Sequence, residues 1–507
     1  MPQDKPPRLL HAGVFLVTFS GLTFEIGLTR IFSATIWYHF AFVAISVALL
    51  GWGLGGFAVH LLRSRAAPSL DRAGALTLAY AAAIPLCLWL IVAFPFHPAR
   101  LPLYFAVSLA PFLLAGSALA IVFALHRRGA ARLYFADLLG ASTGALGVAV
   151  LLARLGAEGA VLSASLAAVA AAACLSRRAR PWSAAAAVVA LLALVVHGRT
   201  GAFGIRSAPT KGMYRHMAAE PAARVDQTGW NSYSRIDAVT GFGGSLARLY
   251  IDSDAWTDVH RWDGRVESLA GADRWFRALP FRVVPRGRTL VIGPGGGSDV
   301  LVALASGHRV TAVELNPLVL RFVRHYGDAA GRLYDHPLVD THLSEGRTFL
   351  ARTRARFDVI FLGFVDSWAS VASGGLSLSE NYLYTTDAFR AYLDHLTDDG
   401  ALVIMRWHAD VPRLLANAVA VLGAEEARRR VAVVMEPGGT AEQPPQMIFM
   451  LRRRPFTEAE ADDLMSWPGA RPVIVPGRAD GPPDAAGLLA GRITLPEYAG
   501  RGKERAG

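Results

Sequence analysis

The sequence predicts a bundle of about seven transmembrane α-helices followed by a doubly wound α/β domain. The 507-residue chain is 53% hydrophobic and only 18% charged, which is more apolar than an ordinary soluble protein. Most of the apolar residues lie before residue 200. In the second half, an apolar run enters a glycine-rich turn and the next apolar run ends on a carboxylate, an order typical of a nucleotide-binding βαβ unit.

Residues 1–197 are predicted to form the transmembrane domain. A helix needs roughly 20 apolar residues to cross a bilayer, and seven segments are apolar enough, of which the last two are short. They are Leu9–Ile31, Trp37–Leu62, Ala73–Phe94, Leu101–Leu125, Leu133–Leu152, Ala160–Leu175 and Trp182–Val196. The first could be a signal peptide, but it is long and further apolar segments follow it, so we expect a retained helix.

The net charge of +11 is concentrated at helix ends. This placement is typical of membrane orientation, in which Lys and Arg stay on the cytoplasmic side, and it argues against nucleic acid as a partner. The richer ends carry Lys5, Arg8, Arg63, Arg65, Arg72, Arg127, Arg128, Arg132, Arg177, Arg178 and Arg180, whereas the other ends carry Arg30, Arg100 and Arg154. The N-terminus is therefore predicted to be cytoplasmic.

Two carboxylates lie within the apolar segments. A charge at the bilayer centre costs about 2.5–3.5 kcal/mol on insertion scales, so Glu25 and Asp137 should be paired, neutral or in a polar cavity. Helix–helix hydrogen bonding, or a pair between Glu25 and Arg30, is favoured over a polar route or a substrate amine site at the membrane face. Two Gly-x-x-x-Gly spacings predict close helix packing: Gly51 with Gly55, and Gly140 with Gly144.

Residues 198–230 are predicted to be a linker, and residues 231–455 the α/β domain. A β-hairpin is expected first, from Arg235–Thr240 and Ala247–Asp252. Sheet strands follow near 289–293, 309–314, 338–343, 357–362 and 400–406, and Val431–Met435 with Met447–Leu451 should close the sheet as an antiparallel edge. The extension over 456–507 is rich in Pro, Gly and charge and is predicted to be partly disordered.

The glycine turn is the strongest functional signal. Gly293, Gly295 and Gly297 follow a strand, and Glu314 comes about 20 residues later, the spacing at which an acid contacts ribose hydroxyls. Two further strands lead to Glu345 and Asp366. Because ligands of open α/β sheets bind at the carboxyl ends of the strands, these residues predict a nucleoside pocket.

Residues from about 230 to about 451 resemble the spermidine synthase family, the polyamine aminopropyltransferases. The resemblance lies in the glycine turn with Val313-Glu-Leu-Asn-Pro317, in Ser344-Glu-Gly-Arg-Thr-Phe-Leu350, in Phe357-Asp-Val-Ile360 with Asp366, and in Leu378-Ser-Glu-Asn-Tyr-Leu-Tyr384. It is closest to the bacterial membrane-fused members. It implies a methyltransferase-like, Rossmann-like fold, with a hairpin that helps to cover the site and an adenosyl-sulfonium group donor.

The resemblance also implies roles for individual residues. Asp366 matches the catalytic position, with a loop-capping aspartate as the alternative. The cofactor-binding set is Gly293, Gly295, Gly297, Asp299, Glu314 and Glu345; the substrate-binding set is Asp252, Tyr382 and Tyr384, of which the tyrosines could instead be core aromatics. No metal is expected.

Two departures from the family put its usual donor and acceptor in question. Gly296 replaces the family's glycine-loop aspartate, and Trp256-Thr-Asp-Val-His-Arg-Trp262 replaces its amine-binding segment.

Three classes of function follow. The first is a membrane-anchored transferase that moves an aminopropyl group from decarboxylated S-adenosylmethionine to an amine. The second is a methyltransferase that uses S-adenosylmethionine on a small or membrane-associated substrate, and the third is a nucleoside-binding transporter or sensor.

The expected partners are a small amine or lipid-associated substrate, membrane lipid and a second copy of the chain. We expect an integral protein of the bacterial cell membrane. The α/β domain should be cytoplasmic, where such donors are made, although seven spans from a cytoplasmic N-terminus place it outside. The short segment Trp182–Val196 is the weakest of the spans.

Overall fold

The computed structural model describes residues 8–36, 40–63, 67–206, 208–365, 382–436, 438, 445–478 and 481–504. The chain divides into two compact units. The helical unit comprises Met1–Pro221, Val225–Asp237 and Tyr250–Ala255, and the α/β unit comprises Ala222–Arg224, Ala238–Leu249 and Trp256–Gly507.

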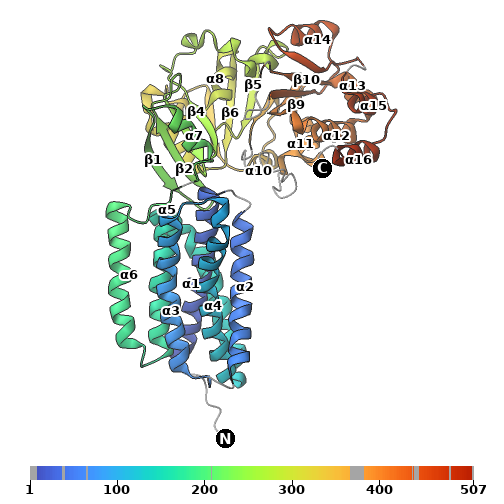
Figure 1. Cartoon of the computed structure of the whole chain (residues 1–507). Coiled ribbons are helices and arrows are strands. Elements are labelled where there is room, and N and C mark those ends of the chain that lie inside the picture. Colours follow the sequence, from blue (N-terminus) through green and yellow to red (C-terminus); the bar gives the residue numbers. More distant parts are fainter. Residues whose placement is uncertain are drawn as a thin grey trace. The chain divides into compact units, whose positions relative to one another are not determined.

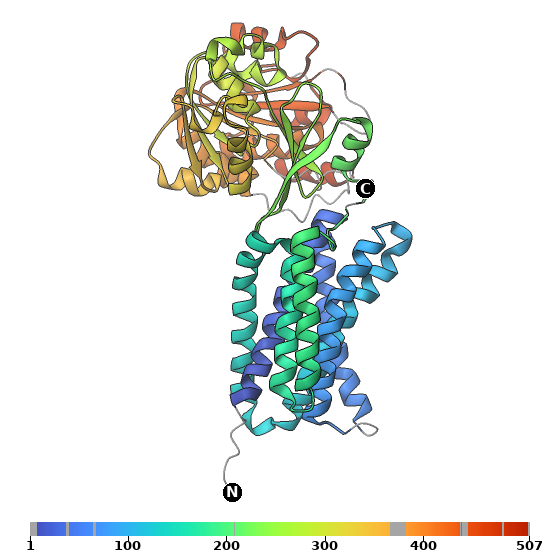
Figure 2. The ribbon, with the colours of Figure 1, turned by 90° about the vertical axis from the view of Figure 1, so that its left-hand side faces the viewer.

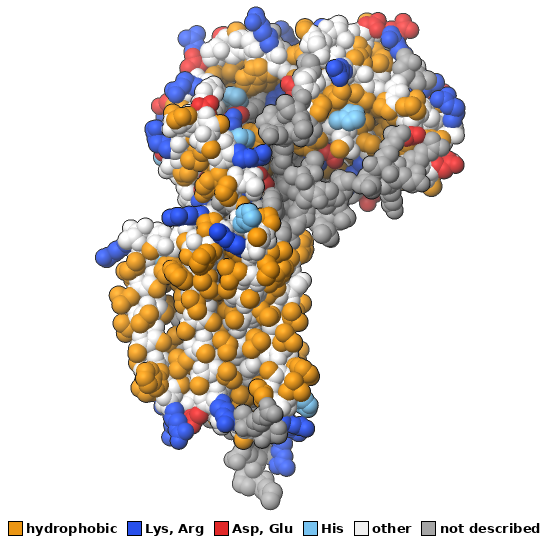
Figure 3. Space-filling model, in the orientation of Figure 1, with side chains coloured by type: hydrophobic (Ala, Val, Ile, Leu, Met, Phe, Trp, Pro, Cys, Tyr) orange, Lys and Arg blue, Asp and Glu red, His pale blue; other side chains and the backbone are white. Residues whose placement is uncertain are grey.

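The helical unit is built from long apolar helices that lie side by side (Figures 1 and 2). They are α1 (Arg8–Thr35), α2 (Phe40–Leu62), α3 (Leu70–Ala93), α4 (Leu101–Leu125), α5 (Ala130–Leu175) and α6 (Arg180–Thr200), followed by the short α7 (Gly212–Ala219). Within the described residues, six helices are long and apolar enough to cross a membrane. In Figure 3, apolar side chains cover the visible flank of this unit.

Helix α5 contains two of the seven predicted segments, because it reverses direction at Gly156. This residue has φ 74° and ψ 178°, a conformation with positive φ that a glycine adopts readily. The arm before it runs parallel to α1 and the arm after it runs antiparallel to α1. Four contacts establish these directions: Phe15 with Gly140, Phe19 with Gly144, Gly27 with Val161, and Gly13 with Leu175. The six helices therefore provide seven arms, and arms that follow each other in the chain run in opposite directions.

Glycines set the closest helix contacts, as the two Gly-x-x-x-Gly spacings predicted. A Cβ at Gly55 on α2 would collide with the backbone of α4, and a Cβ at Gly116 on α4 would collide with the backbone of Trp52 on α2. Gly140 and Gly144 meet the backbone of α1 in the same way. Close approach of the backbones maximises van der Waals contact between these helices.

The two carboxylates of the long apolar helices lie at separate places in the unit. Glu25 is half-buried on α1 and Asp137 is half-buried on α5. Arg30, a candidate partner for Glu25, donates a hydrogen bond to the backbone oxygen of Tyr233. The backbone oxygen of Asp137 accepts from the Thr18 hydroxyl at 2.9 Å.

A four-stranded sheet has the order β1-β2-β3-β4. Its strands are β1 (Arg224–Trp230), β2 (Arg235–Thr240), β3 (Ala247–Ile251) and β4 (Ala255–Val259). The predicted hairpin corresponds to the neighbours β2 and β3. The region 198–230 contains α7 and β1, and residues 225–237 group with the helices, so this region is structured and is not a simple linker.

The main sheet of the α/β unit has eight strands in the order β12-β10-β11-β9-β8-β5-β6-β7. The strands are β5 (Gly287–Ile292), β6 (His308–Glu314), β7 (Val339–Leu343), β8 (Phe357–Gly363), β9 (Leu396–Trp407), β10 (Val431–Met435), β11 (Gln446–Arg452) and β12 (Arg471–Ile474). β5 pairs in parallel with β6 and β8, so the order reverses between β5 and β8. This reversal confirms the doubly wound sheet. β11 pairs antiparallel with β9 and with β10, as predicted for the antiparallel edge of the sheet.

Helices connect these strands, and two more helices follow the last strand. They are α8 (Ser298–Ala305), α9 (Pro317–His325), α10 (Gly346–Arg352), α11 (Thr386–Asp394), α12 (Val411–Leu422), α13 (Ala424–Arg430), α14 (Glu458–Met465), α15 (Pro483–Leu489) and α16 (Leu495–Glu504). The core is formed by buried strand residues such as Ile360, Leu402 and Phe449.

The part of the segment 456–507 that the structure describes is folded, although the segment was predicted to be partly disordered. It contains β12, which pairs antiparallel with β10, and α14, α15 and α16. Ile474 and Leu488 are each 2% exposed or less and belong to the same core as the central strands. Burial of a few apolar side chains in a pre-existing core offsets a composition that is otherwise typical of loops.

Candidate functional site

The glycine turn between β5 and α8 lies at the point where the strand order reverses, which is where open α/β sheets bind their ligands. Gly293, Gly295 and Gly297 have φ of 67°, 57° and 102°, values that favour glycine. The N–H of Gly296 donates to the Thr257 hydroxyl at 2.8 Å, and a Cβ at Gly296 would collide with the Asp258 carbonyl. Strand β4 therefore fixes the turn from one side.

Glu314, the last residue of β6, reaches this turn. It is 7% exposed; its Oε2 accepts from Gly295 N at 3.3 Å, and its Oε1 accepts from Asn316 N at 2.9 Å. Burial raises the pKa of Glu314, and the two backbone N–H groups oppose this shift. A carboxylate accepts more than two hydrogen bonds, so it retains capacity for ligand hydroxyls.

Two exposed leucines stand at the same edge of the sheet. Leu315, directly after Glu314, is 42% exposed, and Leu343, at the end of β7, is 59% exposed. Apolar side chains at the rim of a polar turn provide surface for a flat heteroaromatic ring. The sequence signal for Leu315 is its place directly after the strand-terminal acid, but neither leucine is among the site residues that the sequence predicted.

Glu345 begins α10 as its N-cap. Its Oε1 accepts from Arg347 N at 2.9 Å and its Oε2 accepts from Thr348 N at 2.8 Å. These bonds satisfy N–H groups that have no partner within the helix. The predicted contact with an adenine amino group would be an additional one, and it stays a prediction.

Asp299 lies in the first turn of α8, against the backbone of Gly363 at the end of β8. It is 4% exposed and forms an ion pair with Arg277, which lies in a 3-10 segment over Phe276–Arg282. Burial raises the pKa of Glu436, which follows β10, while the charge of Arg277 lowers it. One guanidinium therefore interacts with two carboxylates. No motif links these three residues, which explains why sequence analysis missed Arg277 and Glu436.

His260 lies within the segment 256–262, which differs from the resembled family. Its Nε2 is 2.8 Å from the Ser298 hydroxyl at the start of α8, and its ring lies 4.8 Å from the Trp275 ring, centre to centre. Burial lowers the pKa of His260, so the imidazole is neutral at physiological pH. A neutral imidazole adds no charge beside the glycine turn.

The two predicted substrate tyrosines differ in exposure. Tyr384 is 3% exposed within the core, and the Arg406 guanidinium lies 4.8 Å from its ring centre. Tyr382 is 58% exposed, and its backbone oxygen accepts from Arg347. Asp366 lies outside the described residues. Its catalytic role stays a prediction, as do the roles of both tyrosines.

Asp252 directly follows β3, belongs to the helical unit and contacts a residue near the end of α1. Its Oδ2 accepts from the Ser33 hydroxyl at 2.6 Å, and its Oδ1 accepts from Arg235 N at 2.8 Å. Lys211, 1% exposed, donates to the backbone oxygens of Ser33 and Asp252, both at 3.0 Å, and its Nζ lies 3.9 Å from Asp254. We call these five residues the Lys211 cluster. The predicted substrate contact of Asp252 would have to coexist with these bonds.

Among the residues that the structure describes, no group of three or more His, Cys, Asp and Glu is arranged to hold a metal ion.

No protein-family model matches the chain, and no curated protein matches it. Solved structures similar to it include three transferase-related proteins. Spermidine synthase from Thermotoga maritima is 15% identical, with a TM-score of 0.34, over 55% of this chain and 87% of that chain. A probable spermidine synthase from Corynebacterium glutamicum is 17% identical, with a TM-score of 0.35, over 49% and 90%. Human methyltransferase-like protein 13 is 17% identical, with a TM-score of 0.28, over 40% and 89%. The strand order itself carries the assignment of the α/β unit to a methyltransferase-like fold.

Proposed function

We propose that the α/β unit transfers an alkyl group from an adenosyl-sulfonium donor. The observation that carries this proposal is the buried carboxylate of Glu314, held by Gly295 N and Asn316 N beside the glycine turn. Such a carboxylate supports recognition of ribose hydroxyls, and exposed Leu315 supports contact with the base. The positive φ of Gly293, Gly295 and Gly297 permits the tight turn that such a site needs.

We further propose an aminopropyl group as the one transferred. Arg277 is the cation bound to Asp299 at the start of α8, and Glu436 adds a second negative charge to it. An arginine that is already paired with a buried carboxylate offers little attraction to the carboxylate of intact S-adenosylmethionine, and this favours a donor that ends in an ammonium group alone.

The proposed reaction is a displacement at carbon. The lone pair of an amine forms a bond to the methylene carbon next to the sulfonium sulfur, and the carbon–sulfur bond breaks with its electron pair on sulfur. The products are a neutral thioether, methylthioadenosine, and an ammonium that loses a proton to a base. Asp366 is our proposal for that base. The protein's main contribution is to hold the two reactants in line.

The test is to identify the thioether product. Purified full-length protein in detergent is supplied with either decarboxylated or intact S-adenosylmethionine and with a mixture of polyamines or membrane extract. Methylthioadenosine from the decarboxylated donor supports aminopropyl transfer, whereas S-adenosylhomocysteine from the intact donor identifies a methyltransferase. Tight binding of methylthioadenosine without turnover of either donor would identify the protein as a nucleoside-binding sensor or transporter. The Glu314→Gln variant is the control for background hydrolysis of the donors.

We also propose that the helices lie in a membrane. The seven apolar arms of the helical unit support this, and apolar burial predicts extraction by detergent but not by high salt or alkaline carbonate. Complete release by carbonate would contradict it.

The orientation needs its own experiment. We propose a cytoplasmic α/β unit because the donor is made there. The positive-inside rule supports the opposite orientation, since α6 is a full-length helix and the sequence places most of the basic residues at the helix ends near the N-terminus of the bundle. In a chain with Cys87 and Cys174 changed to serine, the exposed Gly243 is changed to cysteine. Its labelling in intact cells by a membrane-impermeant maleimide would refute the cytoplasmic placement.

A further inference from the structure

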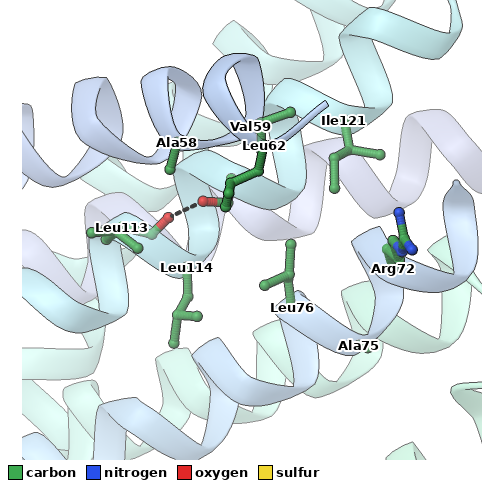
Figure 4. Close-up of a pocket in the computed structure, with 10 residues that line it drawn as sticks. Ala58, Val59, Leu62, Arg72, Ala75, Leu76, Leu113, Leu114 and Ile121 are labelled. Atoms are coloured by element: carbon green, nitrogen blue, oxygen red, sulfur yellow. Dashed lines mark hydrogen bonds between the residues drawn. The ribbon is translucent and has the colours of Figure 1, made fainter. Parts of the chain in front are cut away.

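A groove of about 500 Å³ lies between α2, α3 and α4 of the helical unit (Figure 4). Its volume is within the range of about 300–1,000 Å³ that is usual for small-ligand sites. The lining is apolar except for one hydroxyl and one guanidinium. It consists of Ala58, Val59 and Leu62 from α2, Arg72, Ala75 and Leu76 from α3, and Leu113, Leu114, Ser117 and Ile121 from α4.

The groove is long. From Ile121 to Leu113 it follows two turns of α4, a length of about 12 Å at 1.5 Å per residue. The length and the apolar lining of the groove suit one or two hydrocarbon chains.

Its walls are fixed and its interior offers no unpaired hydroxyl. The glycine contacts of Gly55 and Gly116 hold α2 against α4. The Ser117 hydroxyl is already bonded, to the backbone oxygens of Leu113 at 2.8 Å and of Gly55 at 3.1 Å. A polar ligand would find no partner in the depth of the groove, so its occupant must be apolar there.

The open end of the groove is basic. Arg72 lies in the first turn of α3, beside the last residue of α2, Leu62. One hydrogen bond from its guanidinium goes to the backbone oxygen of Ala67, and a guanidinium has five N–H donors. Arg63 follows α2 and Arg127 follows α4 at the same end of these helices. This end attracts an anion.

It is also the end at which α1 begins. Ser176, which follows α5, bonds to Asp71 on α3, and Gly13 on α1 faces Leu175 at the end of α5. The chain leaves the bundle at the other end of α1, where Ala208 N donates to Thr35 O. The groove is therefore remote from the Lys211 cluster.

We propose that this groove binds an anionic phospholipid, with an acyl chain along α4 and the phosphate on Arg72. Arginine and phosphate form paired, charge-assisted hydrogen bonds, and the lining matches the chain in polarity. The inference rests on the proposed membrane insertion and is independent of the proposed transfer reaction.

The test uses the full-length protein in phosphatidylcholine vesicles that contain a phosphatidylglycerol with a photoactivatable diazirine on its acyl chain. We expect labelling of peptides from α2, α3 and α4 that line the groove. Ala75→Phe fills the groove and should reduce this labelling at least fivefold, whereas Leu86→Phe, at an exposed position of α3, should not. Arg72→Gln should remove about a fivefold preference over the same probe on phosphatidylcholine, the equivalent of ~1 kcal/mol per basic residue near the surface. Arg128→Gln, at the same end but outside the lining, is its control.

Several results would overturn the inference. Labelling spread evenly over the exposed helix faces, or unchanged by Ala75→Phe, would mean ordinary lipid contact. Equal labelling by the two headgroups would remove the role of Arg72, and cross-links between two copies at the groove would identify a second chain as its occupant. Failure of the protein to float with the vesicles would refute membrane insertion instead, and activity with either donor is measured separately.

Discussion

Replacement of Glu314 by glutamine is the sharpest test of the donor site. The change keeps the shape of the side chain but removes the charge that accepts hydrogen bonds from ligand hydroxyls. A hydrogen bond to a charged group contributes about 1.5–3 kcal/mol, and ~1.4 kcal/mol is a factor of ten in Kd. We therefore expect methylthioadenosine to bind about 10- to 100-fold more weakly. Asp340→Asn, at an exposed acid of β7 that pairs with His342, should leave Kd unchanged.

The pH dependence gives the same test a second readout. Burial raises the pKa of Glu314, so the folded protein holds this proton more tightly than the unfolded chain does. Its contribution to stability is thus present below the unfolded pKa and is lost as the pH rises through the folded value. Ribose hydroxyls prefer the ionised form, so affinity should fall as the pH drops through the folded pKa. The glutamine variant should lack this dependence.

Calorimetry with methylthioadenosine and its 2′-deoxy analogue, on wild type and on Glu314→Gln, tests the contact between Glu314 and the 2′-hydroxyl. If Glu314 contacts the hydroxyl, loss of that hydroxyl costs affinity in the wild type and nothing in the variant. Additive effects, within about 0.3–0.5 kcal/mol, would refute the contact. Thermal unfolding of both proteins checks that the variant is folded.

Three other predictions test catalysis, the glycine turn and the Lys211 cluster. Asp366→Asn should lower turnover by ~10²–10⁴-fold at saturating donor while donor affinity is kept, and near wild-type turnover would remove Asp366 as the base. Gly296→Ala should lower the free energy of unfolding by about 1–3 kcal/mol, because its Cβ meets backbone, whereas Gly243→Ala, in open space, should not; equal melting temperatures would contradict this. Lys211→Met should destabilise the detergent-solubilised protein by about 1–3 kcal/mol by leaving two buried carbonyls unpaired, and Arg215→Met, at an exposed site, is its control. A Lys211→Met protein as stable as the control would show that water replaces the amine.

Local signals predicted the elements whose residues lie close together in the chain. The glycine turn and Glu314 belong to one βαβ unit, so their spacing was informative. The gap between the segments ending at Leu152 and starting at Ala160 likewise anticipated the reversal at Gly156.

Contacts between distant residues left no such signal. β12 is short and becomes a strand only because β10 offers it an edge. The pairing of Arg277 with Asp299, and of Asp252 with Ser33, joins side chains whose own neighbours in the sequence are unremarkable. Burial and partner identity at these sites depend on the assembled fold.

The Lys211 cluster has a practical consequence for work on the α/β unit alone. A fragment cut at residue 198 would lose α1, and with it the Ser33 oxygens that Lys211 and Asp252 use. A buried ammonium and a buried carboxylate would then face solvent at the base of β2 and β3. Such a truncation should yield aggregated or partly unfolded material, and biochemistry on this protein is best begun from the full-length chain.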